Sequence, residues 1–183
     1  GHAPPLIHAA NSAGTLAHQR ARRTMVRAGI AVYGISPGPA LDDLAAALHP
    51  ALALRARVAW VKRVGPGDGI SYGLRHTFDR PTTVATVPLG YADGVSRRLF
   101  HTGGQVLIGG RRRTIVGVVT MDQVMVDCAD DEVSIGDDVV LIGAQGDEHV
   151  TAPEWATRLG TIAYEITCAI SARIPRTYLG TRR

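Results

Sequence analysis

The 183-residue chain is 45% hydrophobic and 20% charged, a composition typical of a globular protein rather than a disordered one. This length suits one large domain or two small ones, and no run of about 18 apolar residues suggests a membrane-spanning helix. The first ten residues, GHAPPLIHAA, lack the pattern of a signal or transit peptide. We therefore expect a cytoplasmic protein.

The basic residues are almost all arginine: the net charge is +4, nineteen of the twenty Lys and Arg residues are arginine, and Lys62 is the only lysine. The densest run, Arg111-Arg112-Arg113, follows Gly109-Gly110 and contains no aromatic residues. A solvated hairpin turn is therefore favoured over a nucleic-acid-binding patch. A mechanism that needs a lysine must use Lys62 or a lysine from elsewhere.

The cysteines and histidines do not indicate a metal site. Cys128 and Cys168 lie forty positions apart, with no C-x-x-C pair, which predicts two reduced thiols. The seven histidines have no ligand-like spacing to one another or to the cysteines. We expect no structural zinc.

The first part of the chain has an α/β pattern. Residues 6–9 are short and apolar like a buried strand, residues 13–26 are compatible with a helix, and residues 29–34 form a second apolar run between glycines. A strand, a helix and a second apolar strand predict a parallel sheet. Pro37, Gly38 and Pro39 mark a boundary or an exit loop.

From about Leu48 the pattern changes to β. Residues 51–64 alternate, with Leu52, Leu54, Ala56, Val58 and Trp60 on one face, which predicts one long half-buried strand. Further strand-like runs are separated by glycine or aspartate turns, at 82–88, 105–108, 114–119, 124–128 and 138–142. This spacing is typical of a β-barrel or a sandwich.

The end of the chain combines helices with a last strand. Thr151 is placed to cap a helix over residues 154–159, and a second helix fits residues 161–169. Residues 172–178 are expected to form an edge strand, where Pro175 is tolerated.

Several short segments have residues that suit ligand binding. Ser12 follows a strand and precedes a helix, where an N-cap is favoured and a phosphate cradle is the alternative. The Gly29 and Ile30 amides could add to that cradle. Arg27 lies just before these two residues. Taken alone, it is expected to be solvated or paired with a carboxylate rather than to contact a ligand.

Three tyrosines lie in or near glycine-bounded segments. They are Tyr72 in GISYG, Tyr91 in PLGYADG and Tyr164 in GTIAYEI, and the polar step TMDQ (120–123) interrupts two apolar strands. Taken singly, each favours a structural role. The glycines of 65–69 lead into no helix and so indicate a turn, not a dinucleotide fingerprint.

Together these segments are far more specific. HAANSA (8–13), MVRAGIAVYG (25–34), GISYG (69–73), PLGYADG (88–94), TMDQ (120–123) and GTIAYEI (160–166) occur in one order across nearly the whole chain. Their order and spacing resemble the C-terminal half of bacterial alanine racemase, an enzyme that uses pyridoxal 5′-phosphate (PLP).

The resemblance implies the fold. Residues 1–47 would be the C-terminal remnant of the PLP-binding (β/α)8 barrel, its last strands. Residues 48–183 would form a mostly β domain, β-barrel-like, with one or two helices. The family works as a head-to-tail homodimer with active sites at the interface, and no nucleic acid or membrane partner is expected.

The resemblance also assigns cofactor residues. Ser12, Gly29, Ile30 and Tyr164 match positions that hold the PLP phosphate. Arg27 matches the arginine that faces the pyridine nitrogen, with His8 behind it. Because arginine does not give up its proton, it keeps that nitrogen unprotonated and weakens the cofactor as an electron sink.

Tyr72 matches the tyrosine that crosses the dimer interface and serves as one of two acid–base groups on the substrate α-carbon. Met121, with Asp122 beside it, matches the position whose amide meets the substrate carboxylate. Tyr91 matches a residue near the active-site entrance, which Tyr164 also narrows. The implied reaction is the interconversion of L-alanine and D-alanine, which supplies D-alanine for peptidoglycan.

Two departures from the family pattern stand out. Val118 occupies a position that is often arginine in the family. The Schiff-base lysine belongs to the early barrel, which these residues do not include, and Lys62 lies in a β-domain strand. We therefore expect the chain as given to be an incomplete, inactive fragment of a PLP-dependent isomerase. The alternatives are a related PLP racemase of another amino acid and a non-catalytic β-barrel assembly module.

Overall fold

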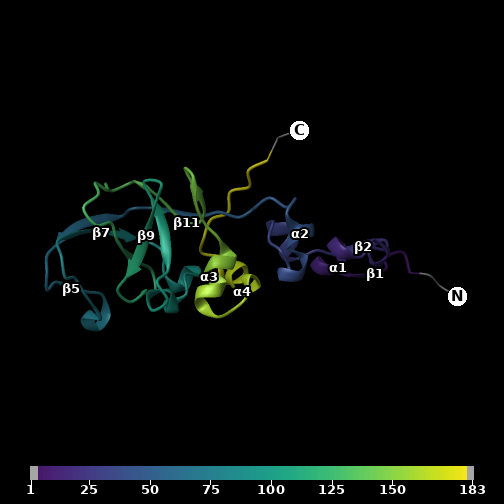
Figure 1. Ribbon diagram of the computed structural model, residues 1–183, viewed down its shortest axis with the longest axis horizontal. Coiled ribbons are helices and arrows are strands. Elements are labelled where there is room, and N and C mark those ends of the chain that lie inside the picture. Colours follow the sequence, from purple (N-terminus) through teal and green to yellow (C-terminus); the bar gives the residue numbers. More distant parts are fainter. Residues whose placement is uncertain (1–3, 181–183) are drawn as a thin grey trace. The chain divides into compact units, whose positions relative to one another are not determined.

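The structure, a computed structural model, describes residues 4–180, which divide into two compact units, one ending at Ala53 and one beginning at Leu54 (Figure 1). Within the described residues, no helix has the length and apolar character needed to cross a membrane.

The first unit contains the predicted parallel pair. Strand β1 (His8–Asn11) pairs in parallel with β2 (Met25–Arg27), and the connection is α1 (Ser12–Ala17) followed by the 3-10 helix η1 (Gln19–Ala21). The helix is shorter than predicted, because the chain turns back through Arg23 at φ +51 before β2. Only Ala10 of β1 is buried, since a two-stranded sheet leaves much of both faces uncovered.

The predicted strand at 29–34 is wrong. Residues Ile30–Tyr33 form the 3-10 helix η2, and the strand lies earlier, at β2. The Ser12 hydroxyl explains the difference, because it accepts the N–H groups of Gly29 and Ala31 that a strand would donate to its neighbour. The unit continues with η3 (Pro39–Leu41) and α2 (Asp42–Ala45).

The second unit is built on one eight-stranded antiparallel sheet, and its mostly β character is confirmed. The strands are β3 (Leu54–Arg57), β4 (Trp60–Val64), β7 (Thr82–Val87), β8 (Gln105–Ile108), β9 (Arg111–Val116), β10 (Val124–Asp127), β11 (Asp138–Gln145) and β12 (Glu148–Val150). Their order is β12-β11-β8-β9-β10-β7-β4, with β3 on β11.

The segment predicted as one long strand closes this sheet. It is two strands with different partners: β3 pairs with β11 and β4 pairs with β7, at opposite ends of the strand order. Around the break, the Val58 N–H bonds Asp137 and the Ala59 N–H bonds Thr86. Two consecutive residues thus bond to segments at the two ends of the strand order, which closes the sheet as a barrel requires. The alternation also shifts there, so Trp60 is 60% exposed rather than buried.

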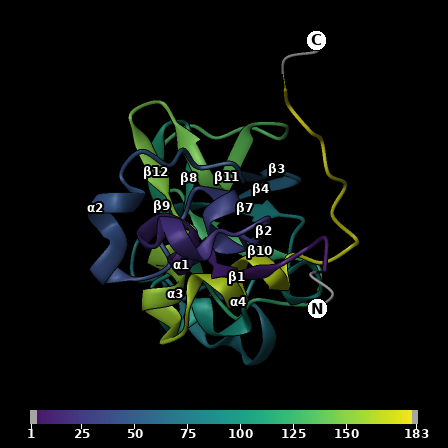
Figure 2. The same ribbon diagram turned by 90° about the vertical axis from the view of Figure 1, so that its right-hand side faces the viewer.

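The core of the second unit lies among these strands and two helices. β8 and β11 each have runs of buried residues, and Figure 2 shows β8, β11 and β12 beside one another. Thr151 caps α3 (Ala152–Leu159), as predicted, and α4 (Ala163–Ala169) follows. Trp155 of α3 is fully buried.

The smaller elements of the second unit are a short hairpin and three 3-10 helices. The hairpin pairs β5 (Gly69–Ile70) with β6 (His76–Thr77), and the helices are η4 (Tyr72–Leu74), η5 (Tyr91–Asp93) and η6 (Arg97–Phe100). No strand forms over 172–178, contrary to the prediction. There Arg176 bonds the carbonyls of Ile170, Ser171 and Ile174, and Pro175 has no N–H to donate.

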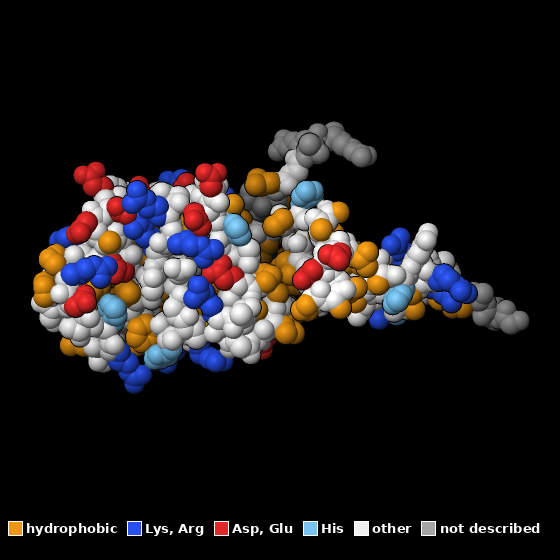
Figure 3. Space-filling model, in the orientation of Figure 1, with side chains coloured by type: hydrophobic (Ala, Val, Ile, Leu, Met, Phe, Trp, Pro, Cys, Tyr) orange, Lys and Arg blue, Asp and Glu red, His pale blue; other side chains and the backbone are white. Residues whose placement is uncertain are grey.

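The arginine run is not a solvated turn. Arg111, Arg112 and Arg113 belong to β9, and the turn before them is made by the two glycines. Arg112 pairs with Glu148 and Glu154, and Arg113 pairs with Asp131. Acidic and basic side chains are interspersed on the face of this unit seen in Figure 3. These arginines are therefore largely neutralised within the fold.

Candidate active site

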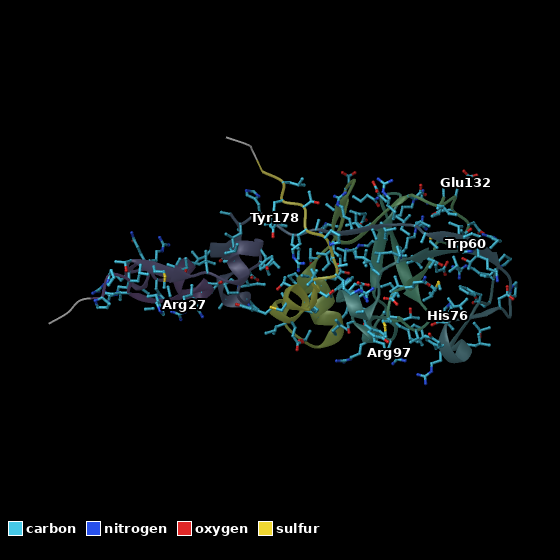
Figure 4. The ribbon with its side chains drawn as sticks, turned by 180° about the vertical axis from the view of Figure 1, so that it is seen from behind. Arg27, Trp60, His76, Arg97, Glu132 and Tyr178 are labelled. Carbon is cyan, nitrogen blue, oxygen red and sulfur yellow. The ribbon has the colours of Figure 1, made fainter. Side chains whose placement is uncertain are left out.

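The first unit brings together the side chains of Arg27, the last residue of β2, and His8, the first residue of β1. The Arg27 Nη1 lies 2.5 Å from the His8 Nδ1. Because a guanidinium can only donate, the His8 Nδ1 is the acceptor and carries no proton in this contact. Both residues are exposed, and Figure 4 shows Arg27 on its strand. Arg27 is thus held at an open strand end by a neutral imidazole nitrogen.

Ser12 is not the N-cap that the sequence favoured. Asn11 caps α1, with its side chain accepting the Gly14 N–H. Ser12 is buried, and its Oγ lies 2.8 Å from the Gly29 nitrogen and 3.3 Å from the Ala31 nitrogen. This hydroxyl therefore joins the start of α1 to the start of η2.

The junction of α1 and η2 has the chemistry of an anion cradle. The first N–H groups of a helix have no partner inside the helix. At the start of η2 the Gly29 and Ala31 N–H groups donate to the Ser12 Oγ, and the Ile30 N–H and the Ser12 hydroxyl proton lie beside them. Gly29 places no side chain over the Ser12 Oγ, and even a Cβ there would stay 3.9 Å away. Backbone amides at such starts bind phosphate groups well. Ser12, Gly29 and Ile30 therefore fit a phosphate.

Tyr72 is held on a loop of unusual backbone geometry. Its neighbours Ser71, Gly73 and Leu74 all have positive φ, at +66, +70 and +44. Such angles are strained for residues other than glycine and persist only where the surrounding fold imposes them. The tyrosine is 73% exposed, so the strain presents the ring outward rather than packing it.

The loop that contains Gly117 and Val118 supports the loop that carries Tyr72. The Ser71 hydroxyl donates to the Val118 carbonyl over 2.8 Å. At Gly117, with φ +68, an added Cβ would lie 2.8 Å from the Ser71 Cβ, so only glycine permits this approach. Val118 itself is buried. The contact of Val118 with the Tyr72 loop is therefore made by its backbone carbonyl.

The turns that carry Tyr91 and Met121 form one surface. The Tyr91 N–H donates to the Thr120 carbonyl and the Ala92 N–H donates to the Met121 carbonyl, both over 3.0 Å. A Cβ on Gly90 would lie 2.3 Å from the Thr120 and Met121 oxygens, so glycine is required there. Tyr91 and Met121 are about half exposed on this surface.

Arg173, which the sequence did not single out, joins this surface to the end of the chain. Its guanidinium pairs with Asp122 over 2.6 Å and with Asp93 over 3.3 Å. The hydrogen bond to Asp122 and the charge of Asp93 raise the pKa of Arg173 above its ordinary value. No local sequence signal marks Arg173, since Asp122 lies 51 positions earlier in the chain.

Tyr164 lies on α4 and is partly exposed. The Thr161 hydroxyl donates to the Glu165 carboxylate at the start of the same helix. A pocket of about 420 Å³ is lined by Tyr91 together with Glu165 and other residues around α4. The helix carrying Tyr164 therefore borders the same hollow as the turn carrying Tyr91.

Lys62 lies on β4 and is exposed, paired in register with Val84. The two thiols differ in environment, with Cys128 buried and Cys168 exposed. Within residues 4–180, no group of three or more His, Cys, Asp or Glu side chains is arranged to hold a metal.

The comparisons with known proteins agree in one family. The family model described as "Alanine racemase, C-terminal domain" matches residues 51–178, and "Alanine racemase, N-terminal domain" matches residues 1–37. Alanine racemases of Frankia casuarinae and Cutibacterium acnes are 49% and 52% identical to the chain. Each alignment spans 177 residues, 96% of this chain and 46% of the relative.

Solved structures give the same result. The alanine racemase of Bacillus anthracis with bound L-Ala-P matches 99% of this chain and 46% of its own, at 46% identity and a TM-score of 0.91. The alanine racemase of Streptomyces lavendulae matches 100% of this chain and 48% of its own, at 43% identity and a TM-score of 0.88.

These relatives are all amino acid racemases, a class of isomerase. The chain belongs to the alanine racemase family, and its second unit is the C-terminal domain of that family. The chain spans about half the length of the curated relatives it matches.

Proposed function

We propose that the protein carrying these residues interconverts L-alanine and D-alanine with PLP as cofactor. In this proposal Tyr72 is one of the two groups that move the α-proton. The observation that carries it is the Tyr72 loop, whose strained backbone holds an exposed tyrosine outward on a support built from Ser71 and Gly117. Family membership adds independent support.

PLP, when bound, eases removal of the α-proton by accepting the electron pair that the proton leaves behind. Ser12, Gly29 and Ile30 would hold its phosphate, because their hydroxyl and amide groups meet at two helix starts. Tyr164 is the fourth proposed phosphate contact. The PLP-bearing lysine would come from a part of the protein outside these residues.

Arg27 would face the pyridine nitrogen of the cofactor. Arginine does not give up its proton in proteins, so Arg27 is a hydrogen-bond donor of fixed charge, and its contact with His8 orients it. A donor that never releases its proton leaves the pyridine nitrogen unprotonated. This limits the reactivity of the cofactor and favours simple proton exchange over side reactions.

The substrate would lie between Tyr72 and the surface made by the Tyr91 and Met121 turns. The Met121 amide would meet the substrate carboxylate, and Tyr91 would line the entrance. A free phenol has a pKa of about 10, so proton removal at neutral pH needs positive charge or hydrogen-bond donors beside it. In the family's homodimer, such groups would come from the partner subunit that Tyr72 reaches.

The same proposal includes the cellular role. A cytoplasmic alanine racemase would supply D-alanine for peptidoglycan. The alternative of an assembly module for an acidic partner gains no support from the arginine run, because Arg112 and Arg113 are already paired with carboxylates.

A chimera tests this function. In it, these 183 residues replace the matching segment of the Frankia casuarinae relative, which shares 49% identity over 177 residues. With PLP present, we expect the chimera to racemise alanine in both directions, as followed by circular dichroism, whereas the 183-residue chain alone does not. A folded, PLP-binding chimera that prefers another amino acid would favour a related racemase, and one that racemises none would contradict the proposal.

A further inference from the structure

The turn that carries Tyr91 (residues 90–94, the tyrosine turn) is packed between two neighbours. On one side lies the turn that carries Met121 (residues 120–123, the methionine turn), which approaches at Gly90. On the other side lies the end of α4, where a Cβ on Gly94 would come within 2.5 Å of the Ala169 oxygen. The three segments therefore form one compact stack.

Arg173 spans this stack. It lies on the segment that follows α4, and the Ser171 N–H, two residues earlier, donates to the Asp93 carbonyl of the tyrosine turn. The Arg173 Nε lies 3.3 Å from the Asp93 Oδ1, and its Nη2 lies 2.6 Å from the Asp122 Oδ1 in the methionine turn. The Arg173 side chain, on the segment after α4, thus bonds both the tyrosine turn and the methionine turn.

The two carboxylates have different surroundings. The Asp93 side chain is only 5% exposed, and its second oxygen accepts the Gly90 N–H over 2.9 Å. The Asp122 side chain is 57% exposed and sits next to Met121 in sequence. Asp122 thus carries a negative charge one residue away in sequence from the amide that would receive the substrate carboxylate, and like charges repel at short range.

We infer that Arg173 is a positioning residue for the substrate carboxylate, acting by neutralising Asp122. This inference rests on the proposed alanine racemase function. Without Arg173, the uncompensated Asp122 would repel the anionic end of alanine. The loss would then fall on substrate binding rather than on proton transfer, which Tyr72 performs.

The test uses steady-state kinetics in the Frankia chimera. Arg173→Met removes the charge while keeping much of the side chain, and we expect KM for alanine to rise about tenfold with kcat changed less than about twofold. Asp122→Asn should shift KM the opposite way, downward. The double variant should return close to the unmodified KM, and added salt should lower the KM of Arg173→Met most.

Two further variants separate charge from general support. Arg173→Lys keeps the charge and should keep KM within about twofold. Arg176→Met is the matched control, because Arg176 bonds only backbone carbonyls in the same segment. It should lower the unfolding temperature without changing KM.

The outcomes are distinguishable. If Arg173→Met and Asp122→Asn raise KM alike, or the double variant shows no rescue, the ion pair is merely structural and the inference is overturned while the racemase function stands. If the unmodified chimera binds PLP but racemises nothing, the proposed function fails, and this inference with it.

Discussion

The two units of the chain differ in how they bury their apolar residues. In the first unit, Ala10 is the only buried residue of β1, and Leu6, Ile7 and Val32 are exposed. In the second unit, the closed sheet surrounds side chains with almost no exposure, and Val139–Ile142 of β11 are buried consecutively. The second unit thus contains a complete core and the first does not.

This contrast separates stability from chemistry. The proposed cofactor residues of the first unit stand on short, open elements, whereas Tyr72, Tyr91 and Met121 stand on loops fixed to a closed sheet. A rigid sheet with strained loops can hold exposed side chains in place. The second unit should therefore tolerate loss of the first, and not the reverse.

The largest expected effect comes from separating the units. Residues 54–183 alone should give one cooperative thermal transition by circular dichroism, because they carry the core. Residues 1–53 alone should give none, since a piece of that size with an open two-stranded sheet buries too little apolar surface. Cooperative unfolding of residues 1–53 would overturn the contrast.

The two tryptophans of the second unit test where its core lies. Trp155 is fully buried and Trp60 is 60% exposed, and Figure 4 labels Trp60. Trp155→Ala should lower the free energy of unfolding by about 3–5 kcal/mol, and Trp60→Ala by about 0.5 kcal/mol or less. Urea unfolding followed by far-UV circular dichroism measures both, and equal losses would place the core elsewhere.

Acid should weaken the second unit through Glu154. Its hydrogen bond with Arg112 holds the pKa of Glu154 below its ordinary 4.5. The folded state therefore binds this proton less readily than the unfolded state. The resulting stability is complete above about pH 4.5 and is lost as the pH falls through the lower, folded-state pKa.

Glu154→Gln should cost about 1–2 kcal/mol at pH 7 and flatten the loss of stability below pH 4.5. Glu132→Gln is the matched control, because Glu132 is exposed and has no ion-pair partner among residues 4–180. Unfolding measured from pH 3 to 7 compares the two. A Glu154→Gln protein that follows the unmodified pH profile would show that this ion pair contributes nothing.

The smallest effect concerns the two thiols. Burial raises the pKa of Cys128 to about 11. At pH 8 only about one Cys128 thiol in a thousand is therefore ionised to the reactive thiolate. Cys168 is exposed. A disulfide reagent such as DTNB should label one thiol per native chain promptly and the second only in denaturant. Two equally fast thiols would show that the sheet opens around Cys128.

Much of this fold could be predicted from the sequence, because alternating apolar residues identify half-buried strands such as β10, and short apolar runs between turns identify buried strands such as β8. The barrel closure could not, since the break at Val58–Ala59 depends on the partners β7 and β11, far away in the chain. The prediction of a strand at Ile30 is wrong, because a short apolar run between glycines fits either a strand or a helix.

For the site, the motif order pointed to Tyr72 and to the Met121 turn without any structure. What it missed is the support around them. Arg173 and the glycine contacts at Gly90 and Gly117 join segments that are distant in sequence, and no local pattern marks such contacts. The sequence likewise favours a helix cap at Ser12, because its bonds to a later helix start leave no local pattern.

The most direct test of the central claim is the rate of alanine α-proton exchange in D2O by the Frankia chimera with Tyr72→Phe. Tyr178→Phe is the matched control, since Tyr178 is also highly exposed but lies on the terminal segment. We predict that Tyr72→Phe lowers racemisation at least about a hundredfold while PLP binding and Tyr178→Phe activity stay unchanged. Full activity in Tyr72→Phe would contradict the account.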